Sequence, residues 1–196
     1  RGGNAGNDEM TSERLRLALC NEVIAGMDFA RQCAFAATLG YDGLEVAPFT
    51  LSDEPHLIGV GQAAAIRRTA EQAGIAICSL HWLLVKPAGL SITSDDAAVR
   101  ARTLDVMRRL IALCAELDGK VLVHGSPAQR RLPEGNGAAE ARKRGIEAFA
   151  AIAEDAQRAG VTYCIAALAT PDANFVTTVE EAIGIVKAKK NLRLLL

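Results

Sequence analysis

The sequence is poor in aromatic residues and histidine, and it lacks long apolar segments. Aromatic residues make up 4% of the 196 residues, and there are only three histidines and one tryptophan. The longest apolar runs are far shorter than the ~20 residues of a membrane-spanning helix, so none is expected. A formal net charge of −1 gives no broad field that would favour nucleic acid or an anionic membrane. We therefore expect neither a nucleic-acid partner nor a membrane partner.

Motifs for common cofactors and nucleophiles are also absent. The five cysteines form no CxxC pair, and each lies in an apolar segment. This predicts buried free thiols in a reducing compartment, which suggests the cytoplasm, rather than a zinc cluster or disulfides. There is no Walker motif, nucleophile elbow or HExxH. GVGQAA at 59–64 fits a dinucleotide fingerprint, but loop-like residues precede it instead of a strand, so a glycine helix start is favoured.

The composition that remains is typical of a globular domain. Half of the residues are apolar and 23% are charged. Residues 1–13 are polar and rich in glycine and asparagine, which predicts a disordered tail. Residues 14–196 are expected to form one domain.

Six short apolar runs alternate with amphipathic stretches. The runs are continuous and apolar, as in strands that are buried on both faces. They are Leu15–Cys20, Gly43–Ala47, Ile75–Leu80, Lys120–His124, Val161–Ala166 and Asn191–Leu196. Capping residues and terminal glycines predict helices over 28–39, 62–73, the segment from Thr93 to about Leu117, 139–159 and 178–187. The buried side of the helix over 139–159 is expected to include Ile146, Phe149, Ala153 and Ala156.

This alternation predicts a parallel sheet that is covered by helices. Two architectures fit: a doubly wound open sheet, or a (β/α)8 barrel, which normally has ~250 residues and eight strands. The last apolar run coincides with the end of the chain, whereas a buried strand is usually followed by a loop that covers its edge. The pattern therefore suggests a fragment or a truncated barrel.

Polar residues gather at the C-terminal ends of the predicted strands, where ligands bind in parallel α/β folds. The third strand ends in His81 and Trp82, and the fourth ends in His124. Because neighbouring strands lie ~4.8 Å apart, both imidazoles are expected to reach one substrate or metal, unless each is structural. Trp82 fits either a platform for stacking a sugar or a plug at a barrel rim. Glu45 lies within an apolar strand and needs a partner, either in a site or in a structural ion pair.

Other polar residues lie in the loops that follow these strands. His56 follows the second strand, so all three histidines are expected on one face. Arg130 and Arg131 follow the fourth strand, where they either hold a phosphate or an acid or are simply solvated.

Five segments carry a family resemblance: LGYDGLEVAPF, SLHWLL, KPAGLSITSDD, VLVHGSPAQRRLP and ANFVTTVEEAIGIV. Together they resemble the sugar-phosphate isomerase and epimerase group of xylose isomerase-like TIM barrels. That family includes ketose epimerases, hydroxypyruvate isomerases and inosose dehydratases, and shares its barrel with endonuclease IV-type enzymes. The resemblance implies a TIM-type (β/α) barrel that is incomplete here, with about six of eight βα units.

The resemblance also implies a divalent metal: Mn, Mg, Co or Zn. In the family, its ligands are a glutamate ending strand five, an aspartate ending strand six, a histidine on strand seven and a glutamate on strand eight. The two glutamates also move the proton beside the substrate carbonyl. The strand-five pattern I-E-P-L corresponds to Ile165-Ala166-Ala167-Leu168, so Ala166 stands where the glutamate is expected. The chain ends at Leu196, where the strand-six aspartate would follow, so we assign no catalytic residue or metal ligand and expect no metal bound by this chain alone.

The substrate-binding residues that the resemblance implies are Glu45, His81, Trp82 and His124, to which we add Arg130. The expected reaction is proton transfer next to the carbonyl of a small ketose, hydroxy-ketone or inosose, with weak or no catalysis by this chain. One alternative is a non-catalytic barrel that binds a sugar or polyol or forms an assembly such as a homo-oligomer. Another is an endonuclease IV-like phosphodiesterase, in which strand-three and strand-four histidines such as His81 and His124 would bind zinc.

Overall fold

The computed structural model describes residues 14–169, 173–187 and 192–195. One sheet contains six parallel strands in the order β1-β2-β3-β4-β5-β6. The strands are β1 (Ala18–Cys20), β2 (Gly43–Val46), β3 (Ala76–His81), β4 (Val121–His124), β5 (Thr162–Ala166) and β6 (Leu192–Leu195). All six predicted strands are confirmed, although β1 is shorter than expected. The predicted disorder of residues 1–13 lies outside the described residues.

Five helices connect the strands. They are α1 (Phe29–Thr38), α2 (Val60–Gln72), α3 (Ala97–Glu116), α4 (Ala138–Ala159) and α5 (Val179–Val186). Short 3-10 turns occupy the loops, namely η1 (Asn21–Ile24), η2 (Pro48–Thr50), η3 (Pro55–Leu57), η4 (Pro127–Arg130) and η5 (Gly135–Gly137). The predicted caps form: Asp28 accepts a hydrogen bond from the amide of Arg31, and Thr178 accepts one from the amide of Glu181. Gly160 ends α4 in the left-handed conformation that glycine adopts without strain.

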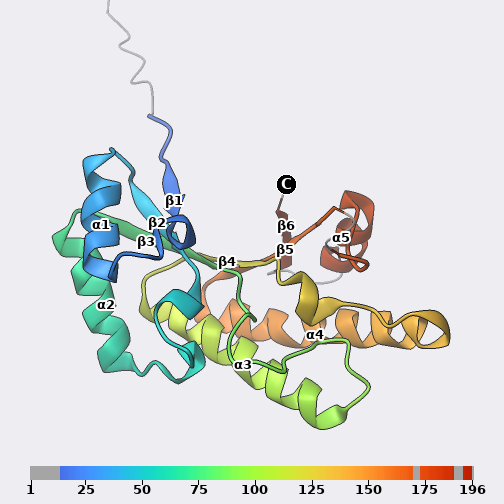
Figure 1. The fold of residues 1–196 in the computed structure, drawn as a ribbon. Coiled ribbons are helices and arrows are strands. Elements are labelled where there is room, and N and C mark those ends of the chain that lie inside the picture. Colours follow the sequence, from blue (N-terminus) through green and yellow to red (C-terminus); the bar gives the residue numbers. More distant parts are fainter. Residues whose placement is uncertain (1–13, 170–172, 188–191, 196) are drawn as a thin grey trace, which may run out of the picture.

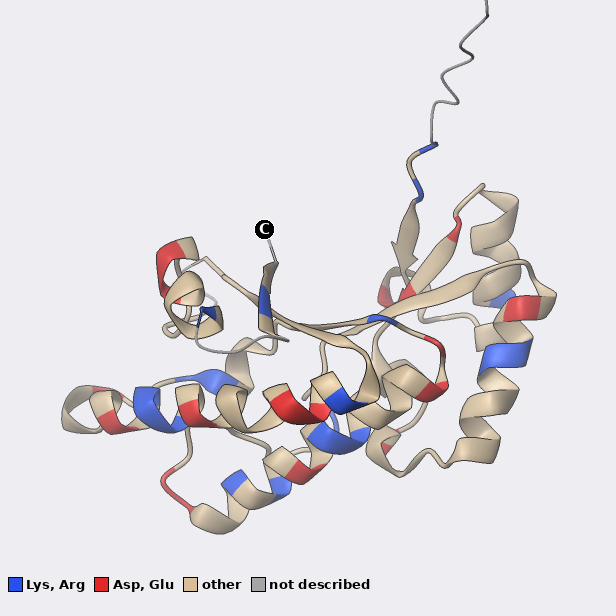
Figure 2. Ribbon diagram, turned by 180° about the vertical axis from the view of Figure 1, so that it is seen from behind, with Lys and Arg blue, Asp and Glu red and all other residues tan. Residues whose placement is uncertain are grey.

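The sheet is wound in one direction and curves into an open trough (Figure 1). A doubly wound sheet reverses its strand order at a switch point, and this sheet has no such reversal. All five helices lie on the convex side of the sheet (Figure 1), and many charged residues of the described chain are on helices while the strands carry few (Figure 2). This arrangement corresponds to six consecutive strands of the wall of a (β/α) barrel, with their connecting helices outside. No helix in the described part of the chain is long and apolar enough to cross a membrane.

Alternation along the strands separates two environments. Leu44, Val46, Leu80, Leu122 and Ile165 are fully buried in the main core beneath the helices. Residues on the other side of the pleat, such as Glu45 and Val123, face the concave side of the trough. The concave face is therefore where polar side chains from several strands can meet.

The prediction that Ile146 lies in the core is wrong. Ile146 is 39% exposed, whereas Phe149, Ala153 and Ala156 are buried as expected. The buried stripe of α4 passes through Gly145 instead, where an added Cβ would lie 2.5 Å from the Phe175 ring. Because successive helical residues are rotated by about 100°, the residue after Gly145 turns outward.

Candidate functional site

A cavity of about 620 Å³ opens at the C-terminal ends of the strands, within the size range of small-molecule sites. Its lining comes from β2, β3, β4, β5 and the loops that follow them. The lining residues are Glu45, His81, Trp82, Val123, Gly125, Ser126, Pro127, Arg131, Ala166 and Leu168. A carboxylate, an imidazole, an indole and a guanidinium thus share one cavity on the concave face.

Glu45 is held by neighbours on both adjacent strands. The register pairs Cys20 with Glu45 across β1 and β2, and an irregularity between Leu44 and Glu45 places Ser79 opposite Glu45 on β3. The Ser79 hydroxyl donates to Glu45 Oε1 at 2.9 Å, and the Cys20 thiol donates to Glu45 Oε2 at 3.1 Å. Burial, together with this hydrogen bond and the charge of Glu45, raises the pKa of Cys20 to about 12. The carboxylate is therefore fixed in place while still lining the cavity.

His81 lies between two carboxylates. Its Nε2 is 2.6 Å from Glu22 Oε2, and its Nδ1 is 3.9 Å from Glu45 Oε2. The side chain is 7% exposed, and the buried Nδ1 has no hydrogen-bond partner among the described residues. Glu22 lies in η1, directly after β1. The sequence analysis did not select Glu22, because a short turn beyond a strand has no periodic pattern that would give the direction of its side chains.

Trp82 follows His81 in a conformation that is unusual for a bulky residue. Its φ is 51°, and the side chain remains 45% exposed beside the cavity. Ser126, another lining residue, also has a positive φ, at 23°. Such backbone strain tends to be found at functional sites, where it directs a side chain into a required position.

The prediction that His124 shares a site with His81 is wrong. His81 pairs with Val123 in the register, so His124, one residue further along β4, points to the helix side of the sheet. There it is completely buried, with Nδ1 2.8 Å from the Tyr163 hydroxyl and its ring edge-on to Phe149. Burial, and then the charge of Arg130, lower the pKa of His124 to about 3. His124 is a neutral core residue, and the histidine pair expected for a phosphodiesterase is not available.

His56 is likewise not part of the cavity. It lies in η3, which packs against α3. Only one of the three histidines, His81, therefore lines the cavity, in contrast to the expectation that all three share a face.

The prediction that Arg130 contributes to the binding site is wrong, and the neighbouring Arg131 lines the cavity instead. Arg130 is completely buried, and Nη1 donates to the carbonyl oxygen of Ala166 at 2.9 Å. Burial lowers its pKa to about 10. Arg131, by contrast, is exposed and lines the cavity. Since η4 ends between these two residues, their side chains point in different directions.

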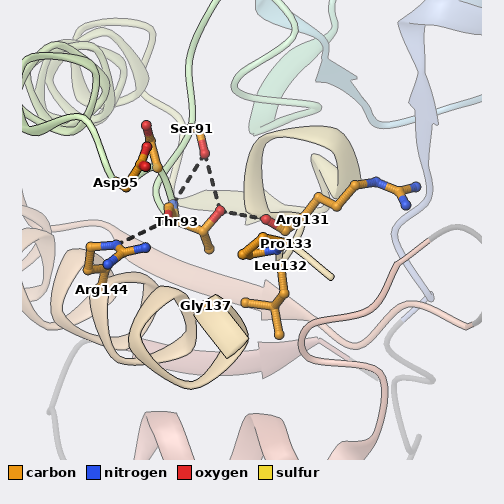
Figure 3. A pocket seen from close by; sticks show the side chains of 9 residues that line it. Ser91, Thr93, Asp95, Arg131, Leu132, Pro133, Gly137 and Arg144 are labelled. Atoms are coloured by element: carbon orange, nitrogen blue, oxygen red, sulfur yellow. Dashed lines mark hydrogen bonds between the residues drawn. The ribbon is translucent and has the colours of Figure 1, made fainter. Parts of the chain in front are cut away.

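The loop that carries Arg131 is pinned by a network around a second cavity of about 490 Å³ (Figure 3). Thr93 Oγ1 donates to the carbonyl oxygen of Arg131 at 2.7 Å, and Arg144 Nε donates to the carbonyl oxygen of Thr93 at 3.1 Å. Asn174 exchanges two hydrogen bonds with the backbone of Leu132. In Figure 3 the Arg131 side chain extends away from the other side chains of this second cavity. These hydrogen bonds fix the backbone of Arg131 and Leu132, while the Arg131 side chain lines the larger cavity.

Ala166 ends β5 in the wall of the larger cavity. It packs with Val123 and Cys164 in a small apolar cluster on the concave side. Its methyl group offers no metal ligand, so the described residues do not fit the metal site that the resemblance implies. Of the expected family ligands, the part of the chain described by the structure supplies none.

A singly wound parallel barrel wall with a polar cavity at the strand ends defines the class of this protein. A profile of the family described as the xylose isomerase-like TIM barrel matches residues 33–196. The chain therefore belongs to the xylose isomerase-like TIM barrel family.

Individual relatives of this chain are sugar epimerases. The chain is 28% identical over 167 residues to D-psicose 3-epimerase of Agrobacterium fabrum strain C58. The aligned region covers 82% of this chain and 54% of that protein. Its fold is similar to the structure of a D-psicose 3-epimerase in the presence of D-fructose, with a TM-score of 0.76, 24% identity, and coverage of 92% of this chain and 62% of that one. The 3-keto-D-glucoside 4-epimerase of E. coli gives a TM-score of 0.74 at 15% identity, with 92% and 67% covered. The chain thus spans 54% of the curated relative's length.

Proposed function

We propose that the chain provides the substrate-binding wall of a sugar epimerase or isomerase site for a small ketose, hydroxy-ketone or inosose. The cavity lined by Glu45, His81, Trp82 and Arg131 supports this proposal. Glu45 and Arg131 supply an acceptor and donors for sugar hydroxyls, and the exposed indole of Trp82 supplies an apolar face for a sugar ring. The relatives named as D-psicose 3-epimerases support a ketose as the ligand.

The reaction of such a site is proton transfer at the carbon beside the carbonyl, which needs a base held on the correct side of that carbon. The observation that carries the proposal about activity is Ala166, because no carboxylate stands at the end of β5. We therefore propose that the chain binds a sugar but has weak or no epimerase activity.

The test is an epimerisation assay with D-psicose and D-fructose in the presence of Mn²⁺, together with elemental analysis of the protein. We expect no turnover above the background rate. In a longer version that also supplies the strand-six to strand-eight ligands, Ala166→Glu is expected to increase Mn²⁺ affinity, and Ala166→Gln, which has a similar size but no charge, is the matched control. Stoichiometric bound Mn together with turnover by the unmodified chain would contradict the inactive interpretation. Equal Mn²⁺ affinity for the two variants would show that the assignment of β5 is wrong.

We also infer that the sheet edges favour self-association. In the described part of the chain, β1 and β6 each pair with only one neighbour, and unpaired parallel edges are open to further pairing. Light scattering on the chain is expected to give a mass above that of the 20.7 kDa monomer. A monodisperse monomer would contradict this inference.

A further inference from the structure

Cys20, Glu45 and His81 bring three different metal-ligand types together on β1, β2 and β3. One donor atom from each, a sulfur, a carboxylate oxygen and an imidazole nitrogen, lies within 4.8 Å of the other two. These three strands are adjacent and parallel, so the backbone itself fixes the spacing of the three side chains. The set differs from the family-type ligands, which would begin at the end of β5.

The separations are close to those of a coordinated ion. Cys20 Sγ is 3.1 Å and His81 Nδ1 is 3.9 Å from the same atom, Glu45 Oε2. A tetrahedral zinc ion with sulfur at ~2.3 Å and nitrogen or oxygen at ~2.0 Å would hold its ligands roughly 3.3–3.5 Å apart. Closing the site therefore requires changes of roughly 0.4 Å in the Cys20–Glu45 separation, roughly 0.6 Å in the His81–Glu45 separation and at most about 1.3 Å in the Cys20–His81 separation, which side-chain rotation can supply.

The neighbours of these ligands also match those of a metal site. Metal-bound histidines usually direct their second nitrogen at a carboxylate, which fixes the ring. Here His81 Nε2 is 2.6 Å from Glu22, so Nδ1 is the nitrogen that remains for an ion. Ser79 donates to Glu45 Oε1, which leaves Oε2 facing the other two ligands.

An independent observation points to a missing ligand at this place. His81 is buried, yet its Nδ1 has no hydrogen-bond partner in the described part of the chain. A buried polar atom without a partner is costly and needs an explanation. An ion between Nδ1, Oε2 and Sγ would satisfy it.

We propose that Cys20, Glu45 and His81 bind a zinc-type divalent ion at the edge of the larger cavity. The mixture of sulfur, nitrogen and oxygen favours Zn²⁺ over Mg²⁺ or Ca²⁺, which prefer oxygen ligands. Three protein ligands leave a fourth position, and because Glu45 and His81 line the cavity, that position faces it. Binding displaces the thiol proton of Cys20, since the thiolate is the form that ligates. The proposal does not depend on a sugar ligand.

The test uses the metal-free chain and two probes. Calorimetric titration with Zn²⁺ is expected to show one ion per chain. Titration with Co²⁺ is expected to produce a thiolate-to-cobalt charge-transfer band, which only a cysteine ligand gives. Cys20→Ser removes the band, and His81→Gln weakens binding of both ions. Glu22→Gln, which alters only the partner of His81, is expected to weaken Zn²⁺ binding about 10–100-fold.

Cys78→Ser is the matched control. Cys78 is a nearby half-buried thiol on β3 that donates to the carbonyl oxygen of Leu44, outside the proposed ligand set. This variant is expected to retain the band and the affinity. Circular dichroism tests whether each variant is folded. If Cys20→Ser does not fold, His81→Gln and Glu22→Gln, which keep the Cys20 thiol, still test the site through their weaker Zn²⁺ binding. No saturable Zn²⁺ binding, or a cobalt band that survives Cys20→Ser, would overturn the proposal.

Discussion

Replacement of His124 by alanine tests whether the two histidines that end neighbouring strands, His81 and His124, have different roles. His124 is completely buried, donates to or accepts from the Tyr163 hydroxyl, and packs edge-on to Phe149 at 5.0 Å between ring centroids. The hydrogen bond contributes about 1 kcal/mol and the aromatic contact about 1 kcal/mol, and the cavity left behind raises the total to roughly 3 kcal/mol. For a chain of this size that corresponds to a melting temperature lower by about 6–12 °C.

Thermal unfolding followed by circular dichroism measures this loss, and a ketose titration of the folded variant at low temperature measures binding. We expect the His124→Ala variant to lose stability and to keep its ketose affinity within about twofold. His81→Ala is the comparison, because it removes a cavity residue and should lower affinity. Unchanged stability with lost binding in His124→Ala would refute the assignment of His124 to the helix side.

Three further predictions concern the same core and cavity. Because the pKa of His124 is lowered to about 3, the unfolded chain binds a proton between about pH 3 and 6.5 that the folded chain does not, so the free energy of unfolding decreases as the pH is lowered, by at most about 1.4 kcal/mol per pH unit. Urea denaturation at pH 7 and below pH 6 should show a smaller loss of unfolding free energy for His124→Phe than for the unmodified chain. Arg131→Gln should weaken ketose binding several-fold with little change in melting temperature, whereas Arg130→Met should leave ketose binding unchanged. A calorimetric titration in which Arg130→Met weakens binding and Arg131→Gln does not would contradict the placement of the two side chains. Trp82→Ala should reduce ketose affinity and abolish any tryptophan fluorescence change on binding, because Trp82 is the only tryptophan; equal affinity would exclude stacking.

Much of the fold could be predicted because its signals are local. Asp28 and Thr178 cap helices through their own side chains, and Gly160 ends α4 because its φ of 70° suits glycine. The order of strands follows from the alternation of β and α. Ile146 was predicted wrongly because Gly145 gives no hydrophobic signal, although Phe175 packs closely against it.

The candidate site was only partly predictable. Glu45, His81 and Trp82 were selected from the sequence and do line one cavity. His124 could not be placed, because a one-residue step along a strand reverses the face, and both faces of β4 are apolar. Cys20 was interpreted as an ordinary buried thiol, since its contact with Glu45 depends on the pairing of β1 with β2.

We propose that the concave cavity binds a small ketose. A titration of the chain with D-psicose, followed by two-dimensional NMR of the amide signals, tests it most directly. We predict saturable shifts that centre on Glu45, His81, Trp82 and Arg131 and that require higher D-psicose concentrations in Trp82→Ala. A folded chain that shows no saturable shifts, or shifts confined to residues outside this cavity, would contradict the account.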